Sequence, residues 1–142
     1  MSDATPIGNP KPLQQGGVTC SVLIVDDDPA IRSIMSMVLK SAGYEVVCAV
    51  DGQEALKILG DGNFDLVITD MLMPGSDGLE LLFAIKKNRP ALRVLVMSGG
   101  GMIGVGDYLK VAKKLGAHEV LEKPFTGETL LAAVAKLLEP GA

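Results

Sequence analysis

Short apolar runs alternate along this chain with longer stretches in which apolar residues recur every three or four positions. The short runs are rich in Val, Ile and Leu without strict alternation, which is typical of strands covered on both faces. They predict strands over residues 20–25, 44–50, 64–69, 93–97 and 119–122. The longer stretches predict amphipathic helices. Their apolar stripes are clearest at Ile31, Ile34, Met35, Val38 and Leu39, and at Leu130, Ala133, Val134, Leu137 and Leu138.

The expected helix boundaries carry sequence signals of their own. Asp51 stands three residues before Glu54, the spacing of a capping box at a helix start. Gly43, Gly60 and Gly116 are expected where helices end, because glycine readily adopts the left-handed conformation that terminates many helices. Five β-α units in a row predict an α/β fold, with a parallel sheet, helices on both of its faces and right-handed crossovers.

Residues 1–18 lack periodicity and are rich in Pro, Gly, Gln and Asn. This composition predicts a flexible N-terminal tail. Residues 19–139 suffice for one domain with a substantial core, and we expect no second domain.

Composition narrows the classes of function. The net charge of -4 and the pI near 4.9 argue against direct nucleic-acid binding, which usually shows a basic excess. No apolar run approaches the roughly 20 residues that span a bilayer, and the N-terminus lacks a signal-peptide pattern. We therefore expect a cytoplasmic protein that does not contact membranes. Cys20 and Cys48 lie in apolar runs and are expected as reduced core residues. His118, the sole histidine, is expected in an exposed turn.

Polar side chains stand where the predicted strands end. The first strand is followed by three acids, the third by a fourth acid, the fourth by a hydroxyl and the fifth by an amine: Asp26, Asp27, Asp28, Asp70, Ser98 and Lys123. Parallel strands place their carboxyl ends at one edge of the sheet, where ligands bind in such folds. Asp28 precedes Pro29, so a helix N-cap is the favoured interpretation for that residue.

This set of groups has a consistent chemistry. Several carboxylate oxygens form a hard-oxygen site suited to Mg²⁺, or to Mn²⁺. A lysine and a serine nearby supply hydrogen bonds to an anion beside the metal. One carboxylate can act as a nucleophile and become an acyl phosphate. The arrangement therefore points to acceptance of a phosphoryl group, which needs mainly positioning and neutralisation of charge.

Four motifs stand at strand ends in this order: "LIVDDDPAIR", "DLVITDMLMPGSDGLELL", "VLVMSG" and "GAHEVLEKPF". Together they resemble the receiver domain of two-component response regulators, over residues 20–138. The resemblance implies a flavodoxin-like, doubly wound (βα)5 fold with strand order 2-1-3-4-5. It implies a signalling protein that is phosphorylated by a sensor histidine kinase or a histidine phosphotransfer protein.

The resemblance also implies a role for each residue. Asp70 would be the phosphoacceptor. Asp26, Asp27, Asp70 and the backbone carbonyl of Leu72 would hold the metal. Ser98 and Lys123 would contact the phosphoryl oxygens and, with Asp70, form the catalytic set. The face formed by the fourth helix, fifth strand and fifth helix would then bind a downstream protein.

Two departures from the family pattern leave the switch open. Receivers usually carry Tyr or Phe three residues before the lysine, where this chain has Val120. The segment after Ser98 is a few residues longer than usual and begins with Gly99, Gly100 and Gly101, which we expect to form a mobile switch loop.

Each polar residue alone has an ordinary explanation, as a solvated turn or loop residue, so the functional interpretation depends on the whole constellation. We expect a switch that is not a metabolic enzyme, and that regulates a separate partner or relays and drains phosphoryl groups. Two alternatives are weighed against it. One is a degenerate receiver that acts as a constitutive binding module. The other, less favoured, is a Mg²⁺-dependent phosphatase or phosphotransferase with an aspartyl nucleophile, because such enzymes usually carry an acid where this chain has Leu72.

Overall fold

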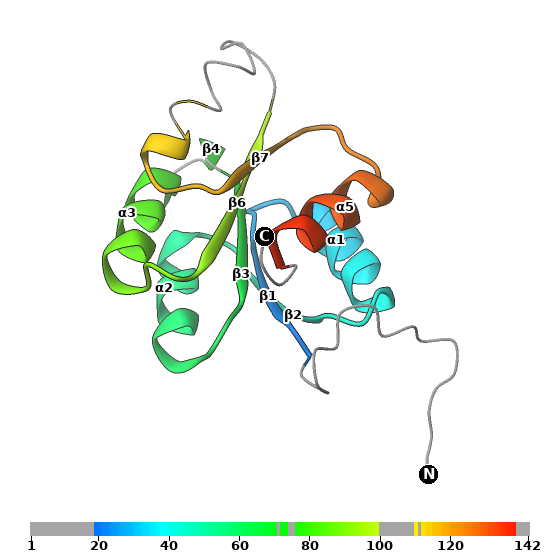
Figure 1. The fold of residues 1–142 in the computed structure, drawn as a ribbon, viewed down its shortest axis with the longest axis horizontal. Coiled ribbons are helices and arrows are strands. Elements are labelled where there is room, and N and C mark those ends of the chain that lie inside the picture. The colour runs from blue at the N-terminus through cyan, green and yellow to red at the C-terminus, as the bar shows by residue number, and fades with distance from the viewer. Residues whose placement is uncertain (1–18, 71, 74–75, 100–109, 111, 139–142) are drawn as a thin grey trace.

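Five parallel strands form one sheet in the computed structural model, which describes residues 19–70, 72–73, 76–99, 110 and 112–138 (Figure 1). The strands are β1 (Ser21–Val25), β2 (Glu45–Ala49), β3 (Leu66–Asp70), β6 (Arg93–Ser98) and β7 (Glu119–Glu122). Their order across the sheet is β2-β1-β3-β6-β7. Counted along the chain, this is the order 2-1-3-4-5, so the predicted fold class is confirmed.

One small element was not predicted. The strands β4 (Leu72–Met73) and β5 (Ser76–Asp77) pair antiparallel as a separate two-stranded sheet. They lie between β3 and the next helix, in a segment for which the sequence predicted no strand.

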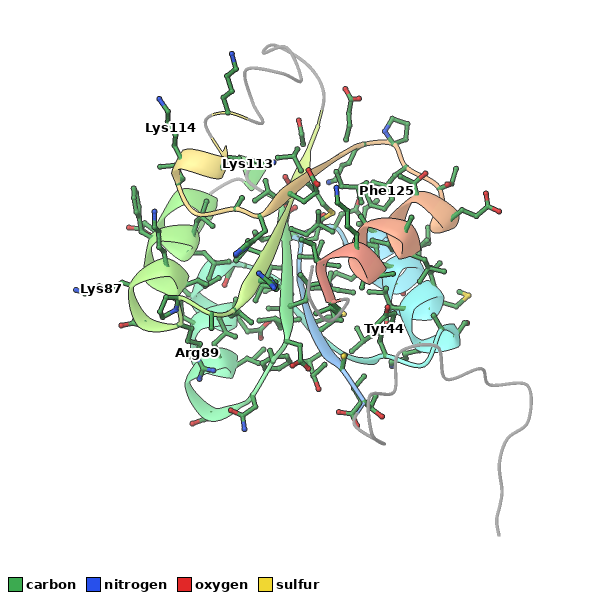
Figure 2. All side chains as sticks on the ribbon, viewed as in Figure 1. Tyr44, Lys87, Arg89, Lys113, Lys114 and Phe125 are labelled. Carbon is green, nitrogen blue, oxygen red and sulfur yellow. The ribbon has the colours of Figure 1, made fainter. Side chains whose placement is uncertain are left out.

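Helices cover both faces of the sheet. On one side lie α1 (Pro29–Ser41) and α5 (Gly127–Leu138), and on the other lie α2 (Gly52–Asp61) and α3 (Gly78–Asn88) (Figure 1). Within the described ranges, every helix is too short or too polar to span a lipid bilayer. In Figure 2, Tyr44 and Phe125 lie on the α1–α5 side, whereas Lys87, Lys113 and Lys114 extend outward on the α3 side.

The core has two halves, one on each side of the sheet. In β1, Val22 and Ile24 pack toward α1 and α5, while Leu23 and Val25 pack toward α2 and α3. All four side chains are fully buried. Burial on both faces explains why the sequence of this strand is uniformly apolar instead of alternating.

Helix starts follow the sequence signals. The Asp28 carboxylate accepts a hydrogen bond from the Ala30 amide at 2.9 Å, so Asp28 caps α1, as predicted. The Asp51 carboxylate accepts from the Glu54 amide at 2.9 Å, and the Glu54 carboxylate accepts from the Val50 amide at 2.8 Å. The predicted capping box at α2 is therefore present, with its return bond directed to the residue before the cap.

Two of the three glycines that were predicted to end helices do so. Gly43 and Gly116 have φ values of 100° and 114°, the left-handed conformation expected after a helix. The expectation for Gly60 was wrong, because α2 continues through Gly60 to Asp61. Its chain leaves the helix at Gly62 in an extended conformation, with φ -124° and ψ 165°. The sequence placed two glycines within one turn, and only the second ends the helix.

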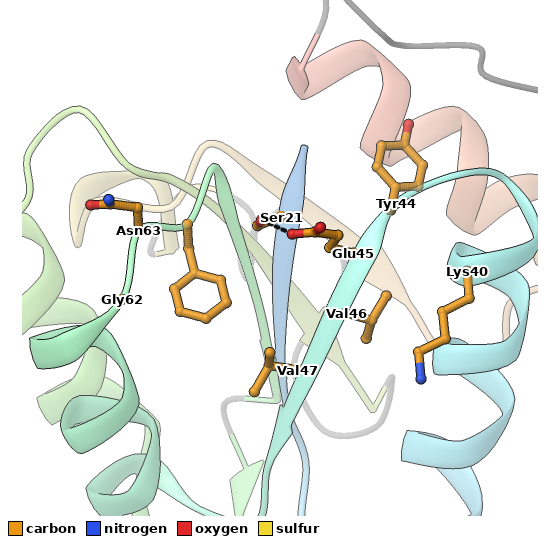
Figure 3. A pocket seen from close by; sticks show the side chains of 9 residues that line it. Ser21, Lys40, Tyr44, Glu45, Val46, Val47, Gly62 and Asn63 are labelled. Carbon is orange, nitrogen blue, oxygen red and sulfur yellow. Dashed lines mark hydrogen bonds between the residues drawn. The ribbon is translucent and has the colours of Figure 1, made fainter. Parts of the chain in front are cut away.

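Cys20 and Cys48 are free, half-buried and packed against the α1–α5 half of the core, as predicted. Burial raises the pKa of both thiols. A groove of about 580 Å³ lies nearby at the amino ends of β1 and β2, between Lys40 of α1 and the chain at Gly62–Phe64 (Figure 3). On its floor the Ser21 hydroxyl donates to the Glu45 carboxylate at 3.1 Å.

His118 is half-buried, so the expectation of an exposed turn residue was wrong. Its backbone amide donates to the Val94 carbonyl at 2.8 Å, and the Val94 amide donates to its Nδ1 atom at 3.0 Å. Burial, with a smaller contribution from the charge of Arg93, lowers the pKa of the imidazole. The neutral ring is therefore part of the connection between β6 and the start of β7.

We expect His118 to make stability depend on pH. Because its pKa is lower in the folded chain than the ordinary value of about 6.5, the unfolded chain takes up the proton first as pH falls. This contribution to stability is complete above pH ~6.5 and declines below it. His118→Asn keeps an acceptor for the Val94 amide without titrating, so its free energy of unfolding in urea should fall less than that of the wild type between pH 7.5 and 5.5. Equal declines in the two proteins would contradict the assignment.

Candidate metal and phosphoryl site

Three carboxylates meet at the carboxyl edge of the sheet. Asp26 and Asp27 follow β1, and Asp70 ends the neighbouring strand β3. One oxygen from each lies within 4.8 Å of the others. Asp26 and Asp70 are buried, with 1% and 7% of their surfaces exposed, whereas Asp27 faces solvent. The structure thus brings together the three acids that the sequence singled out.

The register of the sheet explains this meeting. Val25 pairs with Thr69, so the next residues, Asp26 and Asp70, come level on adjacent strands. Asp70 in turn pairs with Met97, which places Ser98 one position further along β6. Ser98 pairs with Glu122, and its carbonyl accepts a hydrogen bond from the Lys123 amide at 2.7 Å. Each polar residue therefore stands at or just beyond the end of its strand.

Lys123 bridges the two buried acids. Its Nζ atom lies 2.9 Å from Asp70 Oδ2 and 3.2 Å from Asp26 Oδ2. Burial by itself would lower the pKa of this lysine, but the hydrogen bonds and charges of Asp70 and Asp26 outweigh that effect and raise its pKa. The ammonium is therefore the protein's own cation at a point where carboxylates would otherwise repel each other.

Asp26 is held through all of its polar groups. Its amide donates to the Ala49 carbonyl at 3.2 Å, and its Oδ1 atom accepts from the Asp28 amide at 2.9 Å. Its carbonyl accepts from the Arg32 guanidinium at 2.7 Å, while Oδ2 faces Lys123. This role of Arg32 was not predicted from the sequence, although a basic residue one turn into the helix after an acidic loop is a usable signal.

The other predicted residues have the following places. Ser98 is buried, with 5% of its surface exposed, and Gly99 is exposed beside it. Leu72 begins β4, two residues after Asp70. Gly100 and Gly101 lie outside the described residues, so the predicted switch loop stays a prediction. Val120 is half-buried on β7 and packs against the α2–α3 half of the core.

The donor set suits a hard divalent cation. Carboxylate oxygens are preferred ligands of Mg²⁺, which binds them at about 2.1 Å and keeps several waters. Oxygens bound to one such ion are about 3 Å apart when adjacent and about 4.2 Å apart when opposite, so three oxygens within 4.8 Å of one another are close enough to be drawn onto one ion. Asp28 is not one of the acids in this cluster, in agreement with its role as a cap.

A family model described as the response regulator receiver domain matches residues 22–135 of this chain. The chain is 38% identical over 118 residues to the DNA-binding transcriptional regulator NtrC of Azospirillum brasilense, covering 83% of this chain and 24% of that protein. It is 36% identical over 124 residues to the transcriptional regulatory protein FixJ of Bradyrhizobium diazoefficiens, covering 85% and 59%. The chain thus spans about a quarter of the length of the NtrC relative.

Solved structures agree with this match. The chemotaxis response regulator CheY4 of Vibrio cholerae superposes with a TM-score of 0.78 at 34% identity, covering 84% of this chain and 99% of that one. The receiver domain of NtrX from Brucella abortus gives a TM-score of 0.78 at 35% identity, with the same two coverages.

We expect Lys123→Met to destabilise the chain in the absence of divalent cations, because it leaves two buried carboxylates without their cation. The loss should lie somewhat below the roughly 3–5 kcal/mol typical of fully buried pairs, since the lysine side chain is 23% exposed. Urea unfolding in EDTA measures it. Lys136→Met is the matched control, because it breaks an exposed pair with Glu119 and should cost no more than about 1 kcal/mol. Equal losses in the two variants would show that the bridge contributes little.

Proposed function

This chain belongs to the response regulator receiver domain family, and on that premise we propose that it is a phosphorylation-switched signalling protein with Asp70 as phosphoacceptor. The observation that carries the proposal is the contact of the Asp70 carboxylate with the Lys123 ammonium, at 2.9 Å, inside the cluster of three acids. Asp70 ends a buried strand, so its carboxylate is held at the sheet edge where an incoming phosphoryl group would arrive.

In the proposed reaction, an oxygen of Asp70 attacks the phosphorus of a phosphohistidine on a partner protein. The new oxygen–phosphorus bond gives an acyl phosphate, and the phosphorus–nitrogen bond breaks. Its electron pair returns to the imidazole nitrogen, which takes a proton from water. The Lys123 ammonium donates a hydrogen bond to one phosphoryl oxygen, and the Ser98 hydroxyl donates to a second. Later attack by water on phosphorus returns the Asp70 carboxylate and releases phosphate.

We assign the metal to Asp26, Asp27, Asp70 and the carbonyl of Leu72, with Mg²⁺ or Mn²⁺ as the ion. The ion would supply positive charge that offsets the charge of the phosphoryl oxygens. Asp26 and Asp27, just after β1, would hold it together with Asp70, which is also the proposed nucleophile. The carboxylate chemistry of the cluster supports this assignment.

The switch is proposed to act through Lys123 and Ser98. Lys123 is the first residue after β7, because that strand ends at Glu122. The amide of Lys123 donates a hydrogen bond to the Ser98 carbonyl, so the two residues are joined through their backbones. A movement of the ammonium toward a phosphoryl group therefore changes the end of β7. The pair between Glu119 of β7 and Lys136 of α5, at 3.2 Å, links that strand to the last helix. Val120 replaces the usual aromatic residue, so we assign no aromatic rotamer change to this chain.

The proposed partners are a histidine kinase or a histidine phosphotransfer protein as donor, and a downstream protein that binds the face containing β7 and α5. The proposed domain is residues 19–139, with 1–18 as a tail, acting in the cytoplasm. The binding-module alternative is less well supported, because the acceptor and the lysine are both present and in contact. Leu72 at the second position after Asp70 argues against the phosphatase alternative, because such enzymes usually carry an acid there.

We expect incubation with acetyl phosphate and Mg²⁺ to add one phosphoryl group to the wild-type chain, detected by intact mass and lost in alkali. Asp70→Asn should abolish the adduct, because an amide oxygen is a far weaker nucleophile. Asp28→Asn is the matched control, since asparagine also caps helices and Asp28 lies outside the cluster, so it should keep the adduct.

Two outcomes would contradict the proposal. The first is a wild-type chain that stays unmodified although a known receiver is labelled under the same conditions. The second is an adduct that survives Asp70→Asn.

A further inference from the structure

Asp27 differs from the other two acids in that it faces solvent. The direction of its Cα–Cβ bond is set by the two peptide units on either side of it, because they fix its φ and ψ angles. The carbonyl of the unit before it belongs to Asp26 and accepts from Arg32 Nη1 at 2.7 Å. The amide of the unit after it belongs to Asp28 and donates to Asp26 Oδ1 at 2.9 Å. Both peptide units are therefore held.

Arg32 is well placed for this contact. It lies one turn into α1, and its own amide donates to the Asp28 carbonyl at 3.1 Å in the first helical hydrogen bond. Its half-buried side chain turns back along the helix to the end of β1. The acidic loop is therefore tied at both ends to the rigid first turn of α1. A short loop held in this way keeps one backbone conformation, so the Cα–Cβ bond of Asp27 keeps one direction.

We propose that Arg32 is a positioning residue for the divalent cation: it orients Asp27 through the Asp26 carbonyl and so raises the affinity of the acid cluster for Mg²⁺. This inference rests on the metal site of the proposed function. Groups that orient metal ligands without touching the metal typically contribute 10-fold or more to affinity. Arg32 touches neither of the acidic side chains in the contacts described above, so its effect passes through the backbone.

A second effect of Arg32 has the opposite sign. Its guanidinium is positively charged, so it repels a divalent cation and weakens binding. The two effects make opposite predictions for removal of the side chain. Loss of positioning weakens Mg²⁺ binding, whereas loss of repulsion strengthens it. Because Arg32 is partly exposed, solvent screens the repulsion, and positioning is expected to dominate.

The test is the Mg²⁺ dissociation constant of the unphosphorylated full chain, taken from the rise in the free energy of urea unfolding across a Mg²⁺ series. Arg32→Met should weaken binding by about tenfold. Arg32→Lys keeps a charge and a donor, so it should recover part of the affinity. Lys40→Met is the matched control: it removes an exposed cation from the last turn of α1, at the far end of the sheet, and should leave the constant unchanged.

The outcomes separate three explanations. Tighter binding in Arg32→Met, with Arg32→Lys equal to the wild type, would mean that Arg32 acts by charge and would overturn the proposal. Lower stability at every Mg²⁺ concentration with an unchanged constant would make Arg32 merely structural and would also overturn it. If the free energy of unfolding of the wild-type chain does not change with Mg²⁺ concentration, the metal site itself is overturned, and this inference with it.

Discussion

The contact of one ammonium with two buried carboxylates is the constraint on which this site depends. Two carboxylate oxygens no more than 4.8 Å apart repel each other by roughly 3 kcal/mol or more at an effective dielectric constant of about 20. A lysine about 3 Å from each attracts each by roughly 5 kcal/mol on the same scale. The attraction outweighs the repulsion, so Lys123 allows Asp26 and Asp70 to remain close together inside the protein. A phosphoryl group or a metal that binds there changes the existing attraction and repulsion among these three charged side chains.

The strand order of the sheet places these three charged side chains next to one another. Strand β1 lies between β2 and β3, so Asp26 comes beside Asp70 without any loop having to bring them together. Strand β7 lies at the edge, two strands from β3, and the long lysine side chain covers that separation. The same lysine is joined through its backbone to Ser98 and begins the segment that leads to α5. A change in the charge at Asp70 therefore has a direct route to the strand and helix proposed to meet a partner.

The sequence predicted what depends on local patterns. All five sheet strands, the caps at Asp28 and Asp51 and the meeting of the three acids follow from apolar runs and from the polar residues at their ends. Contacts that depend on three-dimensional packing were not predictable in this way. The bond between His118 and Val94 joins residues 24 positions apart, and the reach of Arg32 to the Asp26 carbonyl depends on a side-chain rotamer. Gly60 shows a third limit, because two nearby glycines offered α2 two places to end.

A crystal structure grown with Mg²⁺ and beryllofluoride, which mimics a phosphoryl group, would test whether the Asp26–Asp70–Lys123 cluster is a metal-assisted phosphoryl site. We expect beryllofluoride on an Asp70 carboxylate oxygen and the metal on Asp26 and Asp27. We also expect Lys123 to leave Asp26 and contact a fluoride. A metal absent from the acids, or beryllofluoride absent from Asp70 at saturating concentration, would contradict this function of the cluster.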